Sequence, residues 1–473
     1  MKLRQLLHHL GVEVKGKKDV DIRGLCSHSK KVAPGDLFIA RKGLKTDGTL
    51  FIEEAMRAGA VAAVTDLYNP FLPLPQIIYD NPQDLEALLA KRFYGDPSEK
   101  LFLVGITGTN GKTTTSYIVQ HLLSECGLIG TIESIIGPRR VPSSLTTPDV
   151  ISVYQYLHEM AAHGSCSCVM EVTSHALMQG RVAGIAFDVG VFTNLSQDHL
   201  DYHGNMQNYA SAKRKLFDQA SIIVANCDDP WMEQVIGNHC EKNLMTYGIL
   251  HEQALLKASQ VRLSSEGSTF FVRYQGTTVG MTTKLVGRFN VYNCLAAMGV
   301  ALAKGMTLQE IAQRLATFAS VTGRLQQVPC NSLGHVYVDF AHTEKALENV
   351  LQTLRECTQG KIITVFGCGG DRDQGKRPKM AHVAEKYSDV VMITSDNPRS
   401  EDPLHIIEQM LQGIEKKEKV MVEPDRKRAI IQALSLAQEK DTVLIAGKGH
   451  EMTQIFKDRV TPFSDKAVVE EYS

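Results

Sequence analysis

The sequence has almost no net charge, no long apolar run and, apart from Cys166 and Cys168, no closely spaced cysteines. Its 51 basic and 52 acidic residues leave a formal net charge of −1, so no overall field favours nucleic acid or an anionic membrane surface. No apolar run approaches the ~20 residues of a membrane span, and Arg4, His8 and His9 interrupt the start of the chain, which makes a poor signal peptide. The ten cysteines include no C-x-x-C pair, which disfavours a zinc site or a disulfide framework. We therefore expect a cytoplasmic protein that spans no membrane and binds no nucleic acid.

The length predicts several domains. At 473 residues the chain is too long for one ordinary domain, and roughly 150 residues per domain suggests about three. Its composition, 43% apolar and 22% charged, is that of a globular protein. We predict an α/β protein with a small N-terminal α/β domain at 1–98, a central P-loop-type domain with a mainly parallel sheet at 99–324, and a Rossmann-like α/β domain at 325–473.

Apolar runs alternate with helical patterns in the second and third of these blocks, which predicts βαβ units and parallel sheets. The expected strands are 101–107, 167–172, 187–194, 221–226, 335–340, 361–367, 389–394 and 441–447.

Three polar segments follow strand ends in the third block. They read CGGDRDQGKR (368–377), SDNPR (395–399) and KGHE (448–451), and together we call them the third-domain rim. Ligands of open parallel sheets bind at the carboxyl ends of the strands, so the three segments should meet in one site. A simple turn is the alternative for SDNPRSEDP, and a dinucleotide fingerprint is disfavoured because Arg372 stands where that motif needs glycine.

A phosphate-binding loop is the strongest single motif. GITGTNGKTTT (105–115) lies between an expected strand and an expected helix, so glycine amides and the helix N-terminus can surround phosphates. Lys112 can neutralise phosphate charge and the Thr113 hydroxyl can bind Mg²⁺. Ile106 stands where the general pattern has glycine, so the loop is a variant.

Two further residues near strand ends could bind metal. Glu171 follows an apolar run, where a carboxylate suits Mg²⁺, and His199 lies beyond the next run. Either could be an ordinary loop residue. Lys213 is one of three cations in a helical pattern and, from the pattern alone, would lie on a solvated face.

Several motifs occur in the order found in the Mur ligases, and the chain resembles that family over all three blocks. They are GTNGKTT (108–114), MEVTSH (170–175), TNLSQDHLDYHG (193–204), YASAKRKLF (209–217), GRFNVYN (287–293), GR (323–324) and VDFAHTEKAL (338–347). The resemblance implies a cytoplasmic ATP-dependent ligase of peptidoglycan synthesis, acting with Mg²⁺. The three rim segments resemble those of members that add meso-diaminopimelate to UDP-N-acetylmuramoyl-L-alanyl-D-glutamate through an acyl phosphate.

The resemblance also implies roles for individual residues, and we expect a monomer. ATP would contact Gly108, Thr109, Asn110, Gly111, Lys112, Thr113, Thr114, Asn290, Asn293, Arg324, Asp339 and His342. Two Mg²⁺ ions would be held by Thr113, Glu171, His199 and a CO₂-derived carbamate on Lys213. A lysine of lowered pKa captures CO₂ readily, which turns a cation into an anionic ligand.

The other two substrates would bind the first and third blocks and parts of the second. The UDP-sugar dipeptide would contact Ser27, Ser29, Leu44, Lys45, Thr46, Thr146, Thr147, Thr173, Gln179 and Arg181. Diaminopimelate would contact Arg372, Asp396, Asn397, Pro398, Arg399, Gly447 and Glu451. A planar guanidinium suits the distal carboxylate of this amino acid, and Glu451 could accept from its distal ammonium.

The chain departs from the family pattern in places. His28-Ser29-Lys30 replaces the usual Asp-Ser-Arg, Phe340 stands where Tyr is common, and Glu344 where Pro is common. Three other hypotheses stay open at this point: an L-lysine-adding ligase, a folate- or cyanophycin-type ligase with the same ATP core, and a non-catalytic nucleotide-binding switch or scaffold. The rim motifs weigh against the first two, and the joint presence of Lys112, Glu171, His199 and Lys213 weighs against the third.

Overall fold

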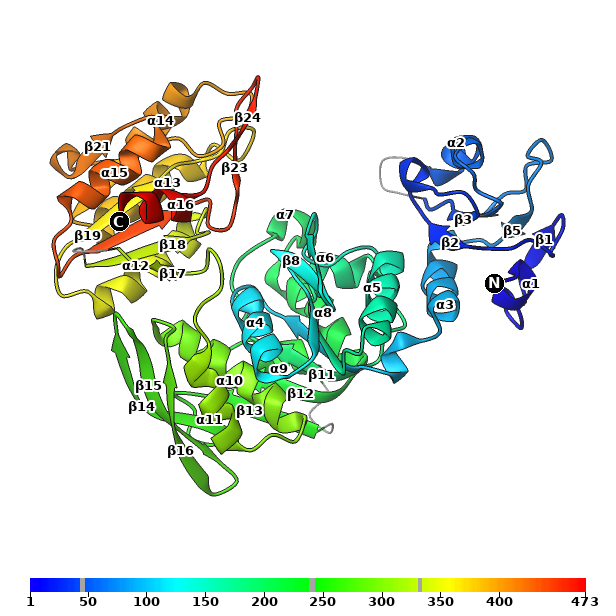
Figure 1. Cartoon of the computed structure of the whole chain (residues 1–473), viewed down its shortest axis with the longest axis horizontal. Coiled ribbons are helices and arrows are strands. Elements are labelled where there is room, and N and C mark those ends of the chain that lie inside the picture. Colours follow the sequence, from blue (N-terminus) through cyan, green and yellow to red (C-terminus); the bar gives the residue numbers. More distant parts are fainter. Residues whose placement is uncertain (43–46, 238–242, 331–333) are drawn as a thin grey trace. The chain divides into compact units, whose positions relative to one another are not determined.

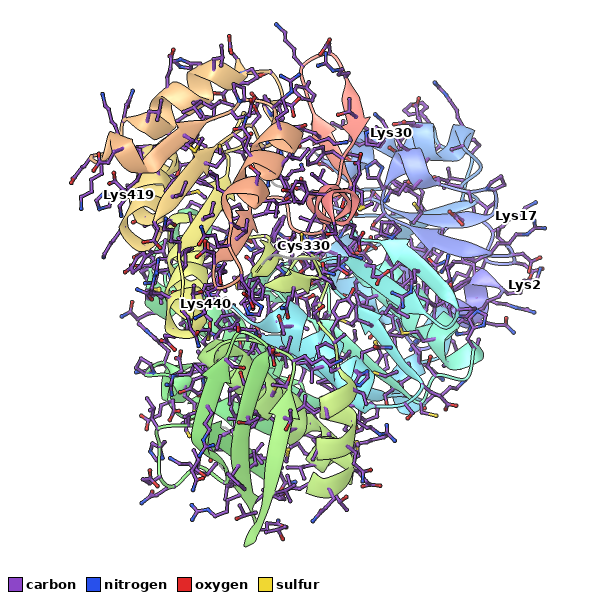
Figure 2. The ribbon with its side chains drawn as sticks, turned by 60° about the vertical axis from the view of Figure 1, so that its left-hand side comes forward. Lys2, Lys17, Lys30, Cys330, Lys419 and Lys440 are labelled. Atoms are coloured by element: carbon purple, nitrogen blue, oxygen red, sulfur yellow. The ribbon has the colours of Figure 1, made fainter. Side chains whose placement is uncertain are left out.

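The computed structural model describes residues 1–42, 47–237, 243–330 and 334–473. The chain packs as two compact units, one formed by residues 1–246 and 299–304 and the other by 247–298 and 305–473. Figure 1 labels the helices and strands along the chain, and exposed lysines such as Lys17, Lys30 and Lys440 project from the ribbon in Figure 2. The predicted domain boundaries at 98/99 and 324/325 stay predictions.

The N-terminal part of the first unit is a five-stranded sheet. The strand order is β1-β5-β4-β3-β2, and every neighbouring pair is parallel except β1 with β5. The elements are α1 (Leu3–Leu6), β1 (Glu13–Lys15), β2 (Gly24–Cys26), β3 (Asp36–Ile39), α2 (Ile52–Arg57), β4 (Ala62–Thr65), β5 (Gln76–Ile78) and α3 (Pro82–Tyr94). Helix α3 starts with a proline at its first position and stops at Gly95 in a left-handed conformation.

The rest of the first unit is built on a mainly parallel sheet. Strands β12-β11-β6-β10-β7 run parallel, and β8 and β9 extend the β7 edge antiparallel. Its strands are β6 (Phe102–Thr107), β7 (Cys126–Ile129), β8 (Glu133–Ile136), β9 (Arg139–Pro142), β10 (Ser167–Glu171), β11 (Phe187–Phe192) and β12 (Ala220–Asn226). Its helices are α4 (Lys112–Leu122), α5 (Val150–Ala162), α6 (Ser174–Met178), α7 (Leu200–His203), α8 (Met206–Asp218) and α9 (Met232–Ile236). Because β6 lies between β10 and β11, the loop after β6 is flanked by two other strand ends.

The second unit begins with antiparallel strands and two helices. β14 pairs with β15 and β15 with β16, both antiparallel. The elements are β14 (Leu256–Ser264), β15 (Gly267–Tyr274), β16 (Thr277–Thr283), α10 (Arg288–Ala303) and α11 (Leu308–Thr317); β13 (Asn243–Gly248) and α10 each include residues of both units. Thr307 and Glu310 form a reciprocal cap at the start of α11.

The C-terminal part of the second unit is a six-stranded sheet in the order β17-β18-β22-β19-β20-β21, parallel except at β17. Its strands are β17 (Gln326–Val328), β18 (His335–Asp339), β19 (Ile362–Phe366), β20 (Val390–Ile393), β21 (Val420–Val422) and β22 (Thr442–Ala446), followed by the hairpin β23 (Thr453–Ile455) and β24 (Val460–Pro462). Its helices are α12 (Glu344–Cys357), α13 (Lys376–Tyr387), α14 (Pro403–Leu411), α15 (Arg426–Leu436) and α16 (Asp465–Tyr472). Separate apolar clusters on the two faces join α12, α13 and α14 to one side and α15 and α16 to the other (Figure 1).

All eight strands expected from apolar runs are present, with ends that differ by one or two residues at most. The structure confirms the predicted α/β fold with mainly parallel sheets. In the described ranges no helix is long and apolar enough to cross a membrane. The nine cysteines within those ranges are all free thiols.

Candidate functional site

The phosphate loop joins β6 to α4 as predicted. Gly108 and Gly111 have φ values of 150° and 85°, which favour glycine because a Cβ would be strained there. A Cβ on Gly108 would also lie 1.9 Å from the Thr193 hydroxyl. The loop rests on the segment after β11: the Thr109 amide donates to the Asn194 carbonyl at 2.8 Å and the Thr193 hydroxyl to the Asn110 carbonyl at 2.7 Å. The loop is therefore held by one backbone contact and one contact from a threonine side chain.

Two lysines point to this loop. The Lys112 ammonium donates to the carbonyls of Gly108 and Thr109, both at 2.9 Å, and the Lys213 ammonium donates to the same Gly108 carbonyl at 2.9 Å. Lys213 is 1% exposed, so the solvated-face interpretation of this residue is wrong. Burial, with Lys112 as a second cause, holds the pKa of Lys213 well below its usual value.

A buried carboxylate lies beside the start of α4. Glu171, fully buried at the end of β10, accepts from the Thr113 hydroxyl at 2.9 Å. It also accepts from the amide and hydroxyl of Thr131 at 2.8 and 3.0 Å. Carboxylate and hydroxyl oxygens are the ligands that Mg²⁺ prefers, and this ion is usually completed by substrate phosphates and waters. The donor set formed by Glu171 and Thr113 therefore fits a phosphate-bound Mg²⁺.

His199 is an exposed residue at φ 51° directly before α7. Its ring lies 4.9 Å from that of His175 and 6.3 Å from that of Tyr209, centroid to centroid. Tyr209 in turn contacts the Thr109 hydroxyl of the phosphate loop at 3.3 Å. His199 is thus brought near the phosphate loop, although no group of three His, Cys, Asp or Glu side chains in the described ranges is arranged to hold a metal by itself.

The residues expected to contact the dipeptide form one hydrogen-bonded group. Arg181 donates to the Thr147 carbonyl at 2.8 Å and to the Gln179 amide oxygen at 2.6 and 3.0 Å. The Thr147 hydroxyl contacts the Glu171 carbonyl at 2.8 Å and the Thr173 hydroxyl at 3.4 Å, and the Thr146 hydroxyl lies 3.2 Å from that of Thr131. This group therefore lies beside the carboxylate that contacts Thr113.

The expected uridine contacts are only partly within the described ranges. Leu44, Lys45 and Thr46 lie outside them. Ser29 is buried at the start of a short 3₁₀ helix, and its neighbour His28 accepts the Lys30 amide. The Ser27 hydroxyl contacts the buried Glu86 carboxyl, whose pKa is raised by burial.

In the second unit, Asn290 and Asn293 lie on α10 and are both buried. The Asn293 amide donates to the Asn290 amide oxygen at 2.9 Å, and the Asn290 amide donates to the Val286 carbonyl at 2.9 Å. Their three-residue spacing on a helix is as predicted.

Arg324, Asp339 and His342 lie close together in this unit. Asp339 accepts the Leu325 and Ala341 amides at 2.6 and 2.7 Å, and burial raises its pKa. The Arg324 guanidinium lies over the ring of Phe340, which stands at a departure from the family pattern, at 5.0 Å from the ring centroid. Two buried nitrogens, Arg324 Nε and His450 Nδ1, have no hydrogen-bond partner among the described residues, which suits an acceptor supplied by a ligand.

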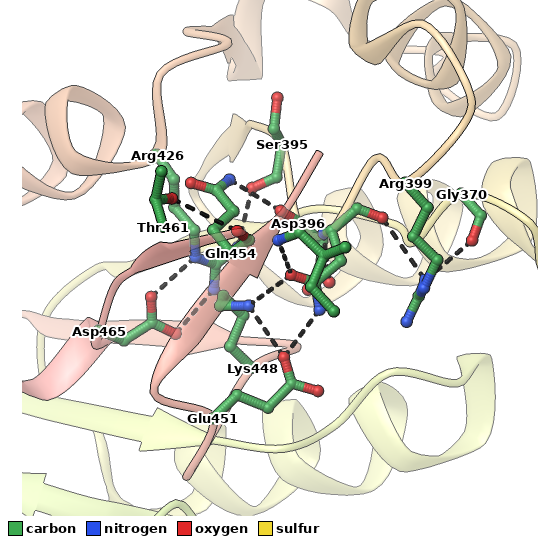
Figure 3. A network of polar contacts seen from close by, with 12 residues as sticks. Gly370, Ser395, Asp396, Arg399, Arg426, Lys448, Glu451, Gln454, Thr461 and Asp465 are labelled. Atoms are coloured by element: carbon green, nitrogen blue, oxygen red, sulfur yellow. Dashed lines mark hydrogen bonds and ion pairs between the residues drawn. The ribbon is translucent and has the colours of Figure 1, made fainter. Parts of the chain in front are cut away.

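The third-domain rim converges as expected (Figure 3). The Asn397 amide donates to Glu451 Oε2 at 2.8 Å, which joins the segment after β20 to that after β22. The Gly370 amide donates to the Asn397 carbonyl at 2.9 Å, and Arg399 Nη1 donates to the Gly370 carbonyl at 2.8 Å, which joins both to the segment after β19. The prediction that three strand-end segments meet in one place is confirmed.

Glycines let the charged side chains approach one another. A Cβ on Gly369 would lie 2.8 Å from Arg399 Nη1 and 3.8 Å from Arg372 Cγ, so both arginines border this glycine. Gly447 has φ 113°, and a Cβ there would meet the Asp396 carboxylate at 2.7 Å. Arg399 itself adopts φ 52° and its amide donates to the Ile455 carbonyl at 3.0 Å.

Two buried arginines support the rim. Arg426 and Asp465, both fully buried, form a two-bond pair at 2.7 and 2.8 Å. Arg426 also donates to the carbonyls of Ser395 and Ala446 at 3.4 and 3.0 Å, at the ends of β20 and β22. Arg377 donates to both Glu401 oxygens at 2.8 and 2.9 Å and to the Gly369 carbonyl at 3.1 Å.

Sequence reasoning missed four residues of these sites. They are Arg377, Arg426, Lys448 and His450. Lys448 and His450 stand within KGHE, directly after an expected strand, and that position was the available signal. Arg377 ends the rim segment 368–377 and had the same signal, whereas Arg426 on α15 gave none, because a cation in a helical pattern is usually exposed.

Known proteins match the chain over its whole length. Residues 21–94 match the model described as Mur ligase family, catalytic domain; 106–301 match the Mur ligase middle domain; and 323–449 match the Mur ligase, glutamate ligase domain. The UDP-N-acetylmuramoyl-L-alanyl-D-glutamate–2,6-diaminopimelate ligase of Caldanaerobacter subterraneus subsp. tengcongensis is 42% identical, covering 100% of this chain and 98% of its own. The protein of the same name from Chlamydia felis is 43% identical, and the match covers 100% of this chain and 99% of that protein.

Solved structures agree with these matches. A structure of a UDP-N-acetylmuramoyl-L-alanyl-D-glutamate–2,6-diaminopimelate ligase is similar with a TM-score of 0.74 and 32% identity, over 100% of this chain and 98% of that one. The MurF ligase of Thermotoga maritima in complex with ADP shares the fold, with a TM-score of 0.65 and 20% identity. The match covers 95% of this chain and 96% of that one. With family models matching most of its length and full-length relatives above 40% identity, the chain belongs to the Mur ligase family.

Proposed function

We propose that the protein joins meso-diaminopimelate to UDP-N-acetylmuramoyl-L-alanyl-D-glutamate at the expense of ATP, giving the tripeptide used for peptidoglycan. The observation that carries the proposal is the third-domain rim, where Arg372 and Arg399 border one glycine and Asn397 contacts Glu451. A rim that carries two arginines and a carboxylate complements an amino acid that has a carboxylate and an ammonium at its far end. The relatives named above carry this activity in their names.

The chemistry divides into two steps. The D-glutamate side-chain carboxylate attacks the γ-phosphorus of ATP, so that an acyl phosphate forms and ADP leaves. The amine of diaminopimelate then attacks the acyl carbon, loses a proton, and phosphate leaves as the peptide bond forms. Lys112 and the amides of the phosphate loop would neutralise charge that builds on the transferred phosphoryl group. Bound Mg²⁺ supplies further charge neutralisation at the phosphates, and Thr113, Glu171 and His199 would hold it.

Lys213 would act as a carbamate. Its buried amine has a pKa held well below the usual value, so an unprotonated nitrogen is available to attack CO₂, with loss of a proton. The product is an anion within reach of the phosphate loop, where it can serve as a metal ligand instead of a competing cation.

The remaining substrate contacts follow the same assignment. Asn290, Asn293, Arg324, Asp339 and His342 would hold the adenosine and phosphates of ATP. The nucleotide sugar would bind the N-terminal domain at 1–98 and the dipeptide would contact the group formed by Thr146, Thr147, Thr173, Gln179 and Arg181. The central and C-terminal domains would be 99–324 and 325–473. The protein would act in the cytoplasm, where nucleotide and amino-acid substrates are available, and we expect it to be a monomer.

The assignment is tested by product analysis. The protein is incubated with ATP, Mg²⁺, the UDP-sugar dipeptide and meso-diaminopimelate, and the molecular masses of the products are measured by mass spectrometry. We expect the tripeptide, with one phosphate released per peptide bond. Phosphate release without the tripeptide, or no dependence on the dipeptide, would contradict the proposal.

A further inference from the structure

Lys448 is a buried cation within the third-domain rim. Its side chain is fully buried, and its ammonium donates to Asn397 Oδ1 and Glu451 Oε2, each at 2.9 Å. The Asn397 amide nitrogen closes the triangle by donating to the same Glu451 oxygen at 2.8 Å. Figure 3 shows Lys448 directed between the segment after β20 and Glu451.

These contacts fix the orientation of the Asn397 side chain. Its amide oxygen accepts from two donors, the Lys448 ammonium and the Ile455 amide at 3.0 Å. The opposite orientation would place an NH₂ group against those two donors, so the amide nitrogen must face Glu451. Asn397 is 2% exposed, so no solvent molecule can easily replace a lost partner.

The two oxygens of the Glu451 carboxylate differ in their hydrogen-bond partners. Oε2 accepts from Lys448 and Asn397, while Oε1 receives no donor from the described residues. The Glu451 side chain remains 34% exposed, in contrast to the 0% of Lys448. One oxygen is therefore anchored inside the domain, and the other is available to a cationic ligand group.

We propose that Lys448 is a positioning residue for substrate recognition: it anchors Glu451 Oε2 and the Asn397 amide so that Glu451 Oε1 faces the ammonium at the far end of a diamino acid. The inference rests on the proposed function, since that function supplies the diamino acid. Lys448 lies behind Glu451 and does not contact the ligand. Its charge offsets the cost of a carboxylate at a partly buried position when the site is empty.

A double-mutant cycle tests the proposal. Lys448→Met, Glu451→Gln and the double variant are compared with the wild type for KM of meso-diaminopimelate, KM of ATP and kcat. Lys448→Met should raise the diaminopimelate KM by roughly 10- to 100-fold, as expected for loss of a charge-assisted bond, and leave the ATP KM unchanged. Because Lys448 acts through Glu451, the double variant should be about as impaired as the worse single variant.

Matched controls separate recognition from folding. Lys440→Met makes the same substitution at an exposed lysine of this unit (Figure 2) and should leave all three constants unchanged. If Lys448→Met does not fold, Lys448→Gln is used in its place. The glutamine side chain can still donate a hydrogen bond but carries no charge. A merely structural role would lower kcat through loss of active enzyme and spare the diaminopimelate KM.

Three outcomes would overturn the inference. They are an unchanged diaminopimelate KM in a folded Lys448 variant, a loss confined to kcat, and a double variant whose KM change is the product of the two single changes. The wild type separates this inference from the proposed function. If the wild type does not use meso-diaminopimelate, the proposed function itself is wrong.

Discussion

Lys112 and Lys213 donate to the same carbonyl, that of Gly108, each at 2.9 Å. Two ammonium groups on one oxygen repel each other, and the buried one, Lys213, has its pKa held well below the usual value by burial and then by Lys112. The arrangement favours a neutral amine at position 213. It also places that amine where an anion would relieve the repulsion and could help to hold a cation at the phosphates.

Lys213→Ala should abolish ligation, and short carboxylates such as formate or acetate should restore part of it, because they can replace the carbamate anion. Ligation is measured by phosphate release with all three substrates present. The control is Lys215→Ala, which removes an exposed lysine from the same helix and should keep wild-type activity. A fully active Lys213→Ala variant would remove the carbamate from the mechanism.

The wild-type enzyme should need more CO₂ as the pH falls. Only the neutral amine takes up CO₂, and protonation of Lys213 increases as pH decreases towards its lowered pKa. Activity in CO₂-depleted buffer, divided by activity with added bicarbonate, should therefore fall with decreasing pH. A ratio that does not vary with pH would argue against this origin of the anion.

Arg399→Lys should raise the KM of meso-diaminopimelate by about 10- to 100-fold, because an ammonium cannot bind a carboxylate through two parallel bonds. The ATP KM should not change. Steady-state kinetics with each substrate varied in turn measures both constants. Arg428→Lys, at an exposed position of the same unit, serves as the control, and an unchanged diaminopimelate KM in Arg399→Lys would exclude Arg399 from the amino-acid site.

Most of the sheet framework could be predicted from the sequence. The run at 187–194 became β11 at Phe187–Phe192, and that at 389–394 became β20 at Val390–Ile393, because buried parallel strands read as continuous apolar runs. The rim was predictable for the same reason, since strand ends meet at one edge. The antiparallel strands β14, β15 and β16 gave no such runs, because many of their side chains are exposed and polar.

The supporting cations were not predictable. Arg426 looks like a surface residue of a helix, and its partner Asp465 is 39 positions away. No local pattern reveals a pairing at that distance along the chain, and a buried arginine is uncommon unless it is paired. Lys448 stands in a predicted rim segment, but its contact with Asn397, 51 positions away, is likewise absent from any local pattern.

Arg426→Met should lower the free energy of unfolding by about 3–5 kcal/mol, because it leaves Asp465 buried and uncompensated. Much of this loss should be recovered in Arg426→Met/Asp465→Leu, which removes both charges. Denaturant unfolding measures the three variants. Lys427→Met, which breaks an exposed pair with Glu471, should cost no more than about 1 kcal/mol, and an equal loss at positions 426 and 427 would contradict this account.

The free energy of unfolding should decrease as pH falls below about 6.5, the usual pKa of histidine. His342 lies at an exposed position, but desolvation by neighbouring protein atoms and the nearby Lys376 and Arg324 lower its pKa, so the unfolded chain takes up a proton at a pH where the folded chain does not. The contribution of His342 to the free energy of unfolding is fully present above its pKa in the unfolded chain. It is lost as the pH falls through its pKa in the folded chain. Denaturant midpoints between pH 7.5 and 5 measure the slope.

His342→Asn should flatten that slope, whereas His382→Asn, at another exposed position, should not. Both variants are compared with the wild type under the same salt conditions. His175, His203 and His450 also have lowered pKa values and contribute to the same slope, so His342→Asn should remove only part of it. A slope that is identical in all three proteins would mean that His342 does not contribute to the pH dependence.

Selection of meso-diaminopimelate by the third-domain rim is tested most directly by changing the amino acid that is supplied. Phosphate release is measured with ATP, Mg²⁺ and the UDP-sugar dipeptide, with meso-diaminopimelate or L-lysine as the only amino acid. L-Lysine lacks the distal carboxylate, so the polar groups of the rim would stay unpaired at a cost of about 1–3 kcal/mol each. We predict a kcat/KM for meso-diaminopimelate at least roughly 100-fold above that for L-lysine. Strong turnover with L-lysine and none with meso-diaminopimelate would contradict the account.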